Sequence, residues 1–446
     1  MKQAARNAPP AVDAVDAVDA ACAGPDTLAA RYAEVRARTL ALAEPLSEAD
    51  CQAQSMPDAS PTKWHLAHVT WFFETFVLER HEAGFKPFHP AFRMLFNSYY
   101  QGVGEPFPRP QRGLVTRPAL AEVKAYRAAV DERMAALLRR AATGELAQLV
   151  ELGLQHEQQH QELILTDIKH LLACSPLAPA YHGSWPLAPV APVRQRWLDF
   201  EGGVTQIGHR GDGFAFDNEK PRHAVLLAPF ALADRLVTHG EWADFVDAGG
   251  YREPRWWLAA GWDWLRAQRI DSPLYWRRDG ARWQVFTLHG LVPLDPHTPV
   301  AHVSLYEADA YARWRAAHDG APIRLPTEAE WEHVAERHEA QALEHGNFAE
   351  SGALHPMPVA RALPGPMQLL GDVWEWTTSG YQGYPGFRPW QGAVGEYNGK
   401  FMVNQYVLRG GSCATPASHI RTSYRNFFPA DARWQFSGVR LAADRS

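Results

Sequence analysis

A proline-rich stretch divides this sequence into two parts with different hydrophobic patterns. Residues 175–194 carry five prolines, a composition typical of a linker between domains. From about residue 27 to 173, Ala, Leu, Arg and Glu dominate, and apolar residues recur at intervals of three and four, which predicts helices. After the linker, short β-like runs alternate with glycine and proline turns. Because 446 residues are too many for one ordinary core, we expect two folded domains and a fold of the α+β class.

The N-terminal part, residues 26–174, is expected to form a helical bundle. Its four helices are predicted at about residues 27–44, 61–82, 119–142 and 146–173. Ser60 can cap the second helix, and Pro61 suits the first helical position because no backbone N–H is needed there. The loop over about 84–118 is rich in proline, glycine and aromatic residues. A loop of that length in a compact bundle usually carries function.

Two further segments complete the predicted organisation. Residues 1–25 are rich in Ala, Pro and Asp, which predicts a disordered tail. Residues 195–446 are expected to form the second domain, with short β-like runs at 204–208 and 225–227. One helix in this domain is well marked, because Thr327 precedes Glu330 by three residues in the pattern of a capping box.

The composition excludes several classes of protein. A formal net charge of −6 disfavours a nucleic-acid binder, which needs a basic face to neutralise phosphates. The four cysteines form no CxxC pair, so we expect a reducing compartment and neither a disulfide scaffold nor a thiolate zinc site. No stretch approaches the roughly 20 apolar residues of a membrane helix, and the N-terminus develops no signal-peptide core. We therefore expect a cytoplasmic protein without nucleic-acid or membrane partners.

The strongest sign of chemistry is the string QHEQQHQE at residues 155–162. His156 and His160 are four residues apart on a predicted helix, so both imidazoles project from one face and can bind one metal ion. A second predicted helix opens with KWHLAH, and either His65 or His68 could face the bundle interior. Because two helices of a bundle can build a metal site in its core, the sequence predicts a site with three histidine ligands. The spacing leaves the identity of the metal open.

The same string also matches H-E-x-x-H, the signature of zinc peptidases. Such a peptidase needs a third ligand, often a glutamate on a following helix, and no glutamate lies between Leu163 and Phe200. His170 and His182 could serve as ligands but lack the context of the motif. We keep a zinc metallopeptidase as the alternative from another class. A second alternative is a binding protein in which the histidines hold a structural metal.

Motifs in both halves of the chain resemble those of one enzyme family. They are LAH at 66–68, HEQQHQE at 156–162, RLPTEAEWE at 324–332, GDVWEW at 371–376 and LRGGS at 408–412. Together they resemble the ergothioneine-type sulfoxide synthases, and the resemblance covers the chain after its N-terminal tail. It implies a DinB-like four-helix bundle followed by a formylglycine-generating-enzyme-like domain, which has a C-type-lectin-like fold.

The resemblance also implies a mononuclear non-haem iron(II) centre. His68, His156 and His160 would bind the iron, and three neutral imidazoles leave positions open for a thiolate and dioxygen. Hercynine, the trimethylated betaine of histidine, would bind beside the metal. The product would gain a carbon–sulfur bond at imidazole C2, with the sulfur oxidised to a sulfoxide. No organic redox cofactor would be needed, because the substrates supply the electrons.

Further residues match positions in the active site of that family. Gln159 matches the position that helps to hold the substrate imidazole. Tyr99 and Tyr100 resemble the paired tyrosines of the cysteine-using branch, in which a tyrosine donates a proton near the iron, a role that suits a phenol. Arg109 and Arg112 are spaced like the arginines that bind the donor's carboxylate, since a planar guanidinium pairs with a carboxylate through two bonds.

The segment 424–429 resembles the one that closes over hercynine. Asn426 would meet the substrate carboxylate, and Phe427 and Phe428 would line a pocket for its quaternary ammonium. The branch that uses γ-glutamylcysteine carries an acid where Phe428 stands, so the sequence favours free cysteine as the donor. An aromatic, less charged pocket would equally suit a selenosugar, the selenol donor used by the related selenoneine synthases to form a carbon–selenium bond. Both donors stay open at this point.

Overall fold

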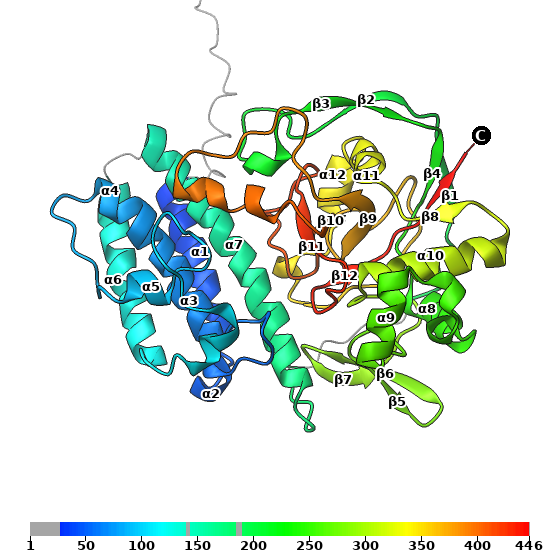
Figure 1. The fold of residues 1–446 in the computed structure, drawn as a ribbon, viewed down its shortest axis with the longest axis horizontal. Helices are drawn as coiled ribbons and strands as arrows, with labels where there is room; N and C mark the ends of the chain where they lie inside the picture. The colour runs from blue at the N-terminus through cyan, green and yellow to red at the C-terminus, as the bar shows by residue number, and fades with distance from the viewer. Residues whose placement is uncertain (1–26, 140–142, 184–189, 446) are drawn as a thin grey trace, which may run out of the picture.

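The computed structural model describes residues 27–139, 143–183 and 190–445. The expected tail at 1–25 lies outside the described residues, as do residues 140–142 of the third predicted helix and 184–189 of the expected linker. Figure 1 shows the helices of the N-terminal part, in blue and cyan, beside a C-terminal part of strands and shorter helices, in green to red. This order of helices and sheets confirms the predicted α+β class.

Four helical segments form the N-terminal bundle close to where the apolar periodicity predicts them. They are α1 (Leu28–Ala43), α3 (Thr62–Phe72), α6 (Leu120–Leu138) and α7 (Gly144–Ala173), and the shorter helices are α2 (Glu48–Gln52), α4 (Glu79–His81) and α5 (Phe92–Leu95). Helix α7 packs against α1 and α3, and α3 also packs against α6. The two histidine-bearing segments of the sequence are therefore neighbouring helices.

The start of α3 differs from the prediction. The helix begins at Thr62, with Pro61 at the cap position and no side-chain cap. Ser60 instead donates its backbone N–H to Asp167 Oδ2 at 2.8 Å, and its Oγ accepts a hydrogen bond from Arg112 Nη1 at 2.9 Å. The capping prediction was wrong because both partners of Ser60 are distant in the chain, so the local pattern does not contain them.

Helices α3 and α7 approach each other closely at one glycine. A π-helical segment, Phe73–Leu78, continues α3 toward α4, and π-turns are frequent at functional sites. Opposite this segment lies Gly153 of α7, where an added Cβ would lie 2.5 Å from the ring of Phe73. Only glycine allows this approach. Because His156 follows Gly153 by about one turn, the close contact brings the histidines of α7 toward α3.

Within the described residues, the C-terminal part forms four small sheets. The first has the order β1 (Trp197–Phe200), β4 (Phe230–Ala233), β13 (Ala442–Asp444), β8 (Ile323–Arg324), and the second the order β11 (Asn426–Pro429), β10 (Gln405–Arg409), β9 (Trp374–Gly380), β12 (Ser437–Gly438). The third pairs β2 (Gly203–Ile207) with β3 (His223–Leu227), and the fourth contains β5 (Trp276–Asp279), β6 (Arg282–Thr287) and β7 (Gly290–Pro293). The β-like run predicted at 204–208 lies on β2 up to Ile207, and the run at 225–227 lies on its partner strand β3.

Helices surround these sheets. They are α8 (His239–Asp247), α9 (Ala259–Gln268), α10 (Leu305–Asp319), α11 (Glu328–Ala335) and α12 (Glu339–Glu344), and short 3-10 turns include Arg109–Leu114, Ala393–Glu396 and Gly399–Phe401. The capping box predicted before α11 is confirmed. The N–H of Glu330 donates to Thr327 Oγ1 at 3.1 Å, and the N–H of Thr327 donates to Glu330 Oε2 at 2.8 Å. Among the described helices, none has the length and apolar character that a membrane crossing requires.

Helix α7 contributes to the cores of both domains, and Figure 1 shows it along their boundary. Its first half places Leu149, Val150 and Leu154 in the core of the bundle. Its second half places Ile164 and Ile168 in the core of the C-terminal domain. Since burial of apolar surface is the main stabilising contribution to folding, this shared helix holds the two domains together.

A buried carboxylate between these two halves adds a polar connection. Glu162 of α7 accepts hydrogen bonds from Trp374 Nε1 at 2.8 Å, Ser412 Oγ at 2.5 Å and Thr415 Oγ1 at 2.7 Å. All three donors belong to the C-terminal domain. Burial raises the pKa of Glu162, and these three hydrogen bonds act against that rise. The motifs at 156–162, 371–376 and 408–412 therefore meet at one point of the domain boundary.

Candidate metal centre

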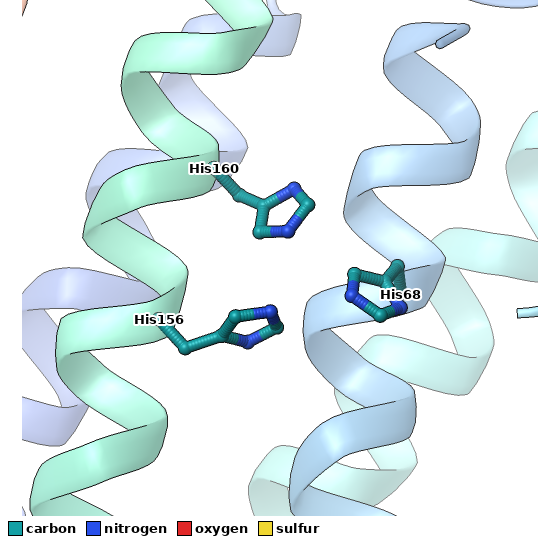
Figure 2. Close-up of side chains that lie close together, drawn as sticks. All are labelled: His68, His156 and His160. Atoms are coloured by element: carbon teal, nitrogen blue, oxygen red, sulfur yellow. The ribbon is translucent and has the colours of Figure 1, made fainter. Parts of the chain in front are cut away.

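Three histidines from two helices face a common point. His68 lies on α3, whereas His156 and His160 lie one turn apart on α7, and Figure 2 shows their rings turned toward one another. One ring nitrogen of each lies within 4.8 Å of those of the others. All three side chains are buried, with exposed fractions of 0, 5 and 8 %. The structure thus brings together the three predicted metal ligands and selects His68 over His65 as the third member.

Unpaired ring nitrogens in this cluster fit a metal ion. His68 Nδ1 donates to the carbonyl of Phe96 at 2.6 Å, which leaves Nε2 as a lone-pair nitrogen without a partner. Both ring nitrogens of His156 are also buried and unpaired. Such groups are costly to bury, and coordination to a metal would satisfy them. Burial lowers the pKa of His68 well below its usual value and that of His156 to about 4, so both rings are neutral, the form that binds metals.

Glu157, the acidic residue of the H-E-x-x-H string, forms ion pairs with two arginines. Both carboxylate oxygens of Glu157 are engaged, one with Arg36 Nη1 at 2.9 Å and the other with Arg127 Nη2 at 2.5 Å. The side chain is fully buried in this ion-pair network. A zinc peptidase needs that glutamate at the metal as a general base. The position of Glu157 therefore argues against the peptidase alternative.

A cavity of about 410 Å³ lies beside the histidines and is lined by residues of both domains. The candidate site residues from the sequence that line it are His65, Tyr99, Arg109, Arg112, His156, Gln159, His160, Asn426, Phe427 and Phe428. They come from α3, from the long loop after it, from α7 and from β11. Tyr100 is not part of this wall. The cavity is thus a shared space between the domains, with two of the three histidines in its wall.

The two adjacent tyrosines occupy different places. Tyr99 lines the cavity, and its hydroxyl lies 3.5 Å from that of Tyr100. Tyr100 packs behind it against Trp71 and Phe76, with ring centroids 5.7 and 5.2 Å away. Burial raises the pKa of both phenols above the usual value of Tyr, so both remain protonated at neutral pH. Tyr99 is the one of the pair that presents itself to the cavity.

The two predicted arginines also differ in their surroundings. Arg109 is exposed and donates to the backbone carbonyl of Asp58. Arg112 is buried, with its guanidinium 3.4 Å from the centroid of the Trp64 ring, and its Nε has no partner. Burial, and next the charge of Arg109, lower the pKa of Arg112 to about 9. No carboxylate of the described residues forms a direct ion pair with Arg112, and the charge of Asp167 favours its protonated form from a greater distance.

Strand β11 supplies an aromatic wall on the side of the C-terminal domain. Phe427 stacks on Tyr381 at 4.0 Å between ring centroids and lies 6.0 Å from Phe401. Phe428 makes an edge contact with Trp434 at 6.1 Å. Asn426 accepts a hydrogen bond from the N–H of Phe427 at its own Oδ1. This wall offers ring faces near an amide, an arrangement that suits a quaternary ammonium ligand.

Comparison with known proteins identifies both parts of the chain. Residues 31–164 match the DinB superfamily, and residues 194–445 match the Sulfatase-modifying factor enzyme 1-like domain. The chain is 34% identical to the hercynine oxygenase of Mycobacterium tuberculosis, over 94% of this chain and 99% of that protein. It is 33% identical to the hercynine oxygenase of Mycolicibacterium thermoresistibile, over 94% of each protein. The chain belongs to the hercynine oxygenase family.

Membership of the hercynine oxygenase family confirms the resemblance that the motifs indicated and the order of the two domain types. A partial relative is the Ergothioneine biosynthesis protein 1 of Schizosaccharomyces pombe, which is 30% identical over 51% of this chain and 27% of that protein. In this hercynine oxygenase family member, the bundle carries the three histidines and the second domain supplies the aromatic wall.

Several cavity residues of this hercynine oxygenase family member were missed by the sequence reasoning. Gln159 Nε2 donates to the hydroxyl of Tyr424 at 2.6 Å, and Tyr397 lines the same cavity. His419 Nε2 lies 3.2 Å from the Tyr424 hydroxyl. Gln435 also lines the cavity, and both of its amide atoms are buried without a partner. No local motif marks Tyr397, His419 or Gln435, and only their shared cavity reveals them.

Proposed function

We propose that this protein is an iron(II)-dependent oxygenase that joins imidazole C2 of hercynine to the sulfur of cysteine. One hydrogen leaves C2 and one leaves the thiol, while dioxygen supplies one oxygen atom to the sulfur and one to water, so four electrons are transferred in balance. Relatives named hercynine oxygenases support the reaction class. The observation that carries the proposal is the buried three-histidine cluster beside a cavity that both domains line.

Iron(II) fits the donor set of this cluster. His68, His156 and His160 are neutral imidazoles, so they would leave the double positive charge of the ion uncompensated and coordination positions open. When bound, iron(II) supplies a site for the donor sulfur as a thiolate and for dioxygen next to the substrate. The three histidine side chains themselves are almost fully shielded from bulk water.

Hercynine would lie between Gln159 and the aromatic wall of β11. The amide of Gln159 donates to the hydroxyl of Tyr424, so it can hold a substrate imidazole in one orientation. The ring faces of Phe427 and Phe401 suit the trimethylammonium group, because a quaternary ammonium is attracted to the face of an aromatic ring. Asn426 on the same strand would meet the carboxylate.

Tyr99 would be the proton donor of the tyrosine pair. Its side chain lines the cavity, whereas Tyr100 lies behind it at hydrogen-bond distance. The raised pKa of Tyr99 keeps its proton in place at neutral pH, which a donor requires. Tyr100 orients the hydroxyl of Tyr99 in this proposal.

Arg112 supports cysteine as the donor. Its buried guanidinium faces the cavity wall without a carboxylate partner among the described residues. An amino-acid donor brings a carboxylate, which would pair with this cation and with Arg109. A neutral sugar would bring no carboxylate to pair with Arg112.

A selenosugar is the second candidate donor, and a different residue favours it. Both amide atoms of Gln435 are buried and unpaired in the cavity wall. A sugar hydroxyl donates and accepts one hydrogen bond each, so it can satisfy both atoms. The aromatic pair Phe428 and Trp434 gives this region an apolar surface on which a sugar ring can pack.

Product mass spectrometry tests both candidates. The protein is loaded anaerobically with iron(II) and hercynine, and oxygen is admitted with cysteine, γ-glutamylcysteine or a selenosugar in separate reactions. We expect the hercynine–cysteine sulfoxide from the first reaction, and a hercynine–selenosugar adduct alone would instead establish the second candidate.

Matched controls separate this reaction from background oxidation. His160→Ala should lose iron binding and product together, whereas His170→Ala, on the same helix but outside the cavity wall, should retain both. Absence of any hercynine adduct with iron bound to the wild-type protein would refute the proposed function. Zinc-restored cleavage of a casein substrate by metal-stripped protein would favour the peptidase alternative.

A further inference from the structure

A chain of hydrogen bonds reaches from the domain boundary to one of the metal-ligand candidates. His65, on α3, lies with its Nδ1 2.8 Å from Nδ1 of His160, on α7. The other nitrogen of His65, Nε2, lies 3.0 Å from Asp167 Oδ2. Exposed fractions of His65 and Asp167 are 2 and 6 %. His65 is thus held between a carboxylate and a metal-ligand candidate, and it is almost fully buried in the wall of the cavity.

The hydrogen-bonding capacity of these groups determines where their protons lie. A carboxylate only accepts, so the contact with Asp167 places the proton of His65 on its Nε2. In a neutral imidazole the Nδ1 of His65 is then an acceptor, and the short contact requires His160 to donate through its Nδ1–H. The remaining nitrogen of His160, Nε2, carries the free lone pair.

We propose that His65 and Asp167 are positioning residues that orient the His160 ring and keep its Nε2 as the metal-binding nitrogen. The inference rests on the proposed function only in requiring a metal ion at the three histidines. In proteins, a ligand histidine usually donates its second N–H to a carboxylate, a carbonyl or water, and this contact sets both ring orientation and tautomer. Here a second histidine stands between the ligand and the carboxylate.

The arrangement is anchored at its far end by the start of α3. Asp167 Oδ2 also accepts the backbone N–H of Ser60 at 2.8 Å, which fixes the carboxylate from a second side. Ser60 in turn accepts a hydrogen bond from Arg112, a residue of the cavity wall. The orientation of His160 therefore depends on a connected set of buried groups and not on the rotamer of its own side chain alone.

The other two histidines of the cluster do not share this support. His68 is held by a backbone carbonyl, that of Phe96. The ring nitrogens of His156 have no partner among the described residues, and its ring packs against Phe72 at 4.9 Å between centroids. A change at His65 or Asp167 should therefore act on one ligand of three and weaken metal binding without abolishing the site.

The test measures metal affinity directly. Cobalt(II) serves as the probe, because its visible absorption reports the ligand field, and its dissociation constant is obtained by competition with a chelator. Loss of an outer-shell partner typically weakens metal binding about 10- to 100-fold. We expect that loss in His65→Phe, with a shifted cobalt(II) spectrum. A smaller loss is expected in Asp167→Asn, whose amide oxygen still accepts from His65 but carries no charge.

Two further variants show whether the effect is specific. In His65→Asn the amide oxygen takes the place of Nδ1 and can accept from His160, so this variant should recover much of the affinity lost in His65→Phe. His170→Ala removes a histidine of the same helix that is bonded to Ser55, and it should bind cobalt(II) as the wild type does. Circular dichroism confirms that each variant is folded before its affinity is compared.

The outcomes test the positioning role of His65 and Asp167 separately from the proposed oxygenase function. Cobalt(II) affinity within twofold of wild type in folded His65→Phe or, should that variant not fold, in folded His65→Ala, which also removes the acceptor for His160, would overturn the positioning role. Wild-type protein that binds the metal tightly but forms no hercynine adduct would overturn the proposed function and leave the positioning role standing. A weakened affinity restored in part by His65→Asn supports the role.

Discussion

Gln159 of helix α7 donates a hydrogen bond of 2.6 Å to the hydroxyl of Tyr424, which belongs to the other domain. The amide that would hold the substrate imidazole is therefore oriented from across the domain boundary. His419 lies with its Nε2 3.2 Å from the Tyr424 hydroxyl and its Nδ1 2.7 Å from Gln155 Oε1. Gln155 precedes Gln159 by one turn of α7. The substrate site thus depends on the correct docking of both domains.

Removing the Tyr424 hydroxyl should weaken hercynine binding while leaving the metal in place. Tyr424→Phe deletes one ordinary hydrogen bond, worth about 1 kcal/mol, so the KM for hercynine should rise about 2- to 10-fold with cobalt(II) affinity unchanged. Steady-state kinetics at saturating donor measure this. Tyr306→Phe, on α10 and outside the cavity wall, is the matched control. An unchanged KM would mean that Tyr424 does not orient Gln159.

The charge of Arg112 should determine the preference for the donor. Arg112→Gln removes a charged partner of a carboxylate, worth about 1.5–3 kcal/mol, so the KM for cysteine should rise about 10-fold or more. The exposed Arg117→Gln serves as the control. An equal rise for cysteine and for a donor without a carboxylate would contradict carboxylate binding by Arg112.

A substitution of Gln435 tests the second candidate donor, the selenosugar, as Arg112→Gln tests cysteine. Gln435→Leu replaces two buried unpaired polar atoms by an apolar side chain, so the ligand-free protein should gain about 1 kcal/mol of unfolding free energy, measured in urea. If a selenosugar is the donor, the same variant should raise its KM several-fold. Unchanged kinetics with both donors would remove Gln435 from the site.

Substitutions of Tyr99 and Tyr100 should change the ratio of reaction products to different extents. Tyr99→Phe removes the hydroxyl that lines the cavity, so thiol oxidation without carbon–sulfur bond formation should become the main outcome. Tyr100→Phe should shift the ratio of the two products less, because its hydroxyl only contacts that of Tyr99. Chromatographic quantification of adduct and disulfide gives the ratio. A larger shift in Tyr100→Phe would reverse the assigned roles.

A buried lysine at the domain boundary should make stability depend on pH. Lys169 of α7 is fully buried, with its Nζ 2.7 Å from His302 Nε2 and 4.7 Å from the centroid of the Phe436 ring. Burial lowers the pKa of Lys169 to about 7. Since the folded pKa lies below that of the unfolded chain, the unfolded chain binds more protons between about pH 7 and pH 10, and stability rises with pH there.

Lys169→Met should remove this dependence. Over that window, each pH unit adds up to about 1.4 kcal/mol to the unfolding free energy of the wild type, and the variant should lack this slope. Urea unfolding between pH 7 and 9.5 measures the difference, with the exposed Lys86→Met as the control. Parallel pH profiles for wild type and Lys169→Met would show that Lys169 keeps its ordinary pKa in the folded protein.

Local patterns were sufficient for part of the site. His156 and His160 share one face of α7 because the helical period places residues four apart on the same side, and that period is a property of the backbone. The capping box of Thr327 and Glu330 formed as predicted for the same reason, since its donors and acceptors lie within four residues.

Contacts between distant segments decided which histidine of α3 joins the pair on α7 and which group Ser60 contacts. His65 and His68 are both buried, and the sequence left both open as ligands. Asp167, 102 positions away, contacts His65, while Nε2 of His68 stays unpaired beside His156 and His160. Ser60 does not cap α3 as predicted, and its backbone N–H donates to the same carboxylate, that of Asp167. A helix period cannot show which of several partners a side chain will meet across a packed interface.

The sequence by itself determined the main helices of the bundle, the two-part organisation, the pair of histidines on α7 and, through its motifs, the family. Only the tertiary structure decided which third histidine joins the pair, that Glu157 is held by two arginines, and that Tyr397, Tyr424 and Gln435 line one cavity with residues of the bundle. Helix formation and capping depend on neighbours in the chain. Burial, unpaired charge and cavity shape depend on segments that only packing brings together.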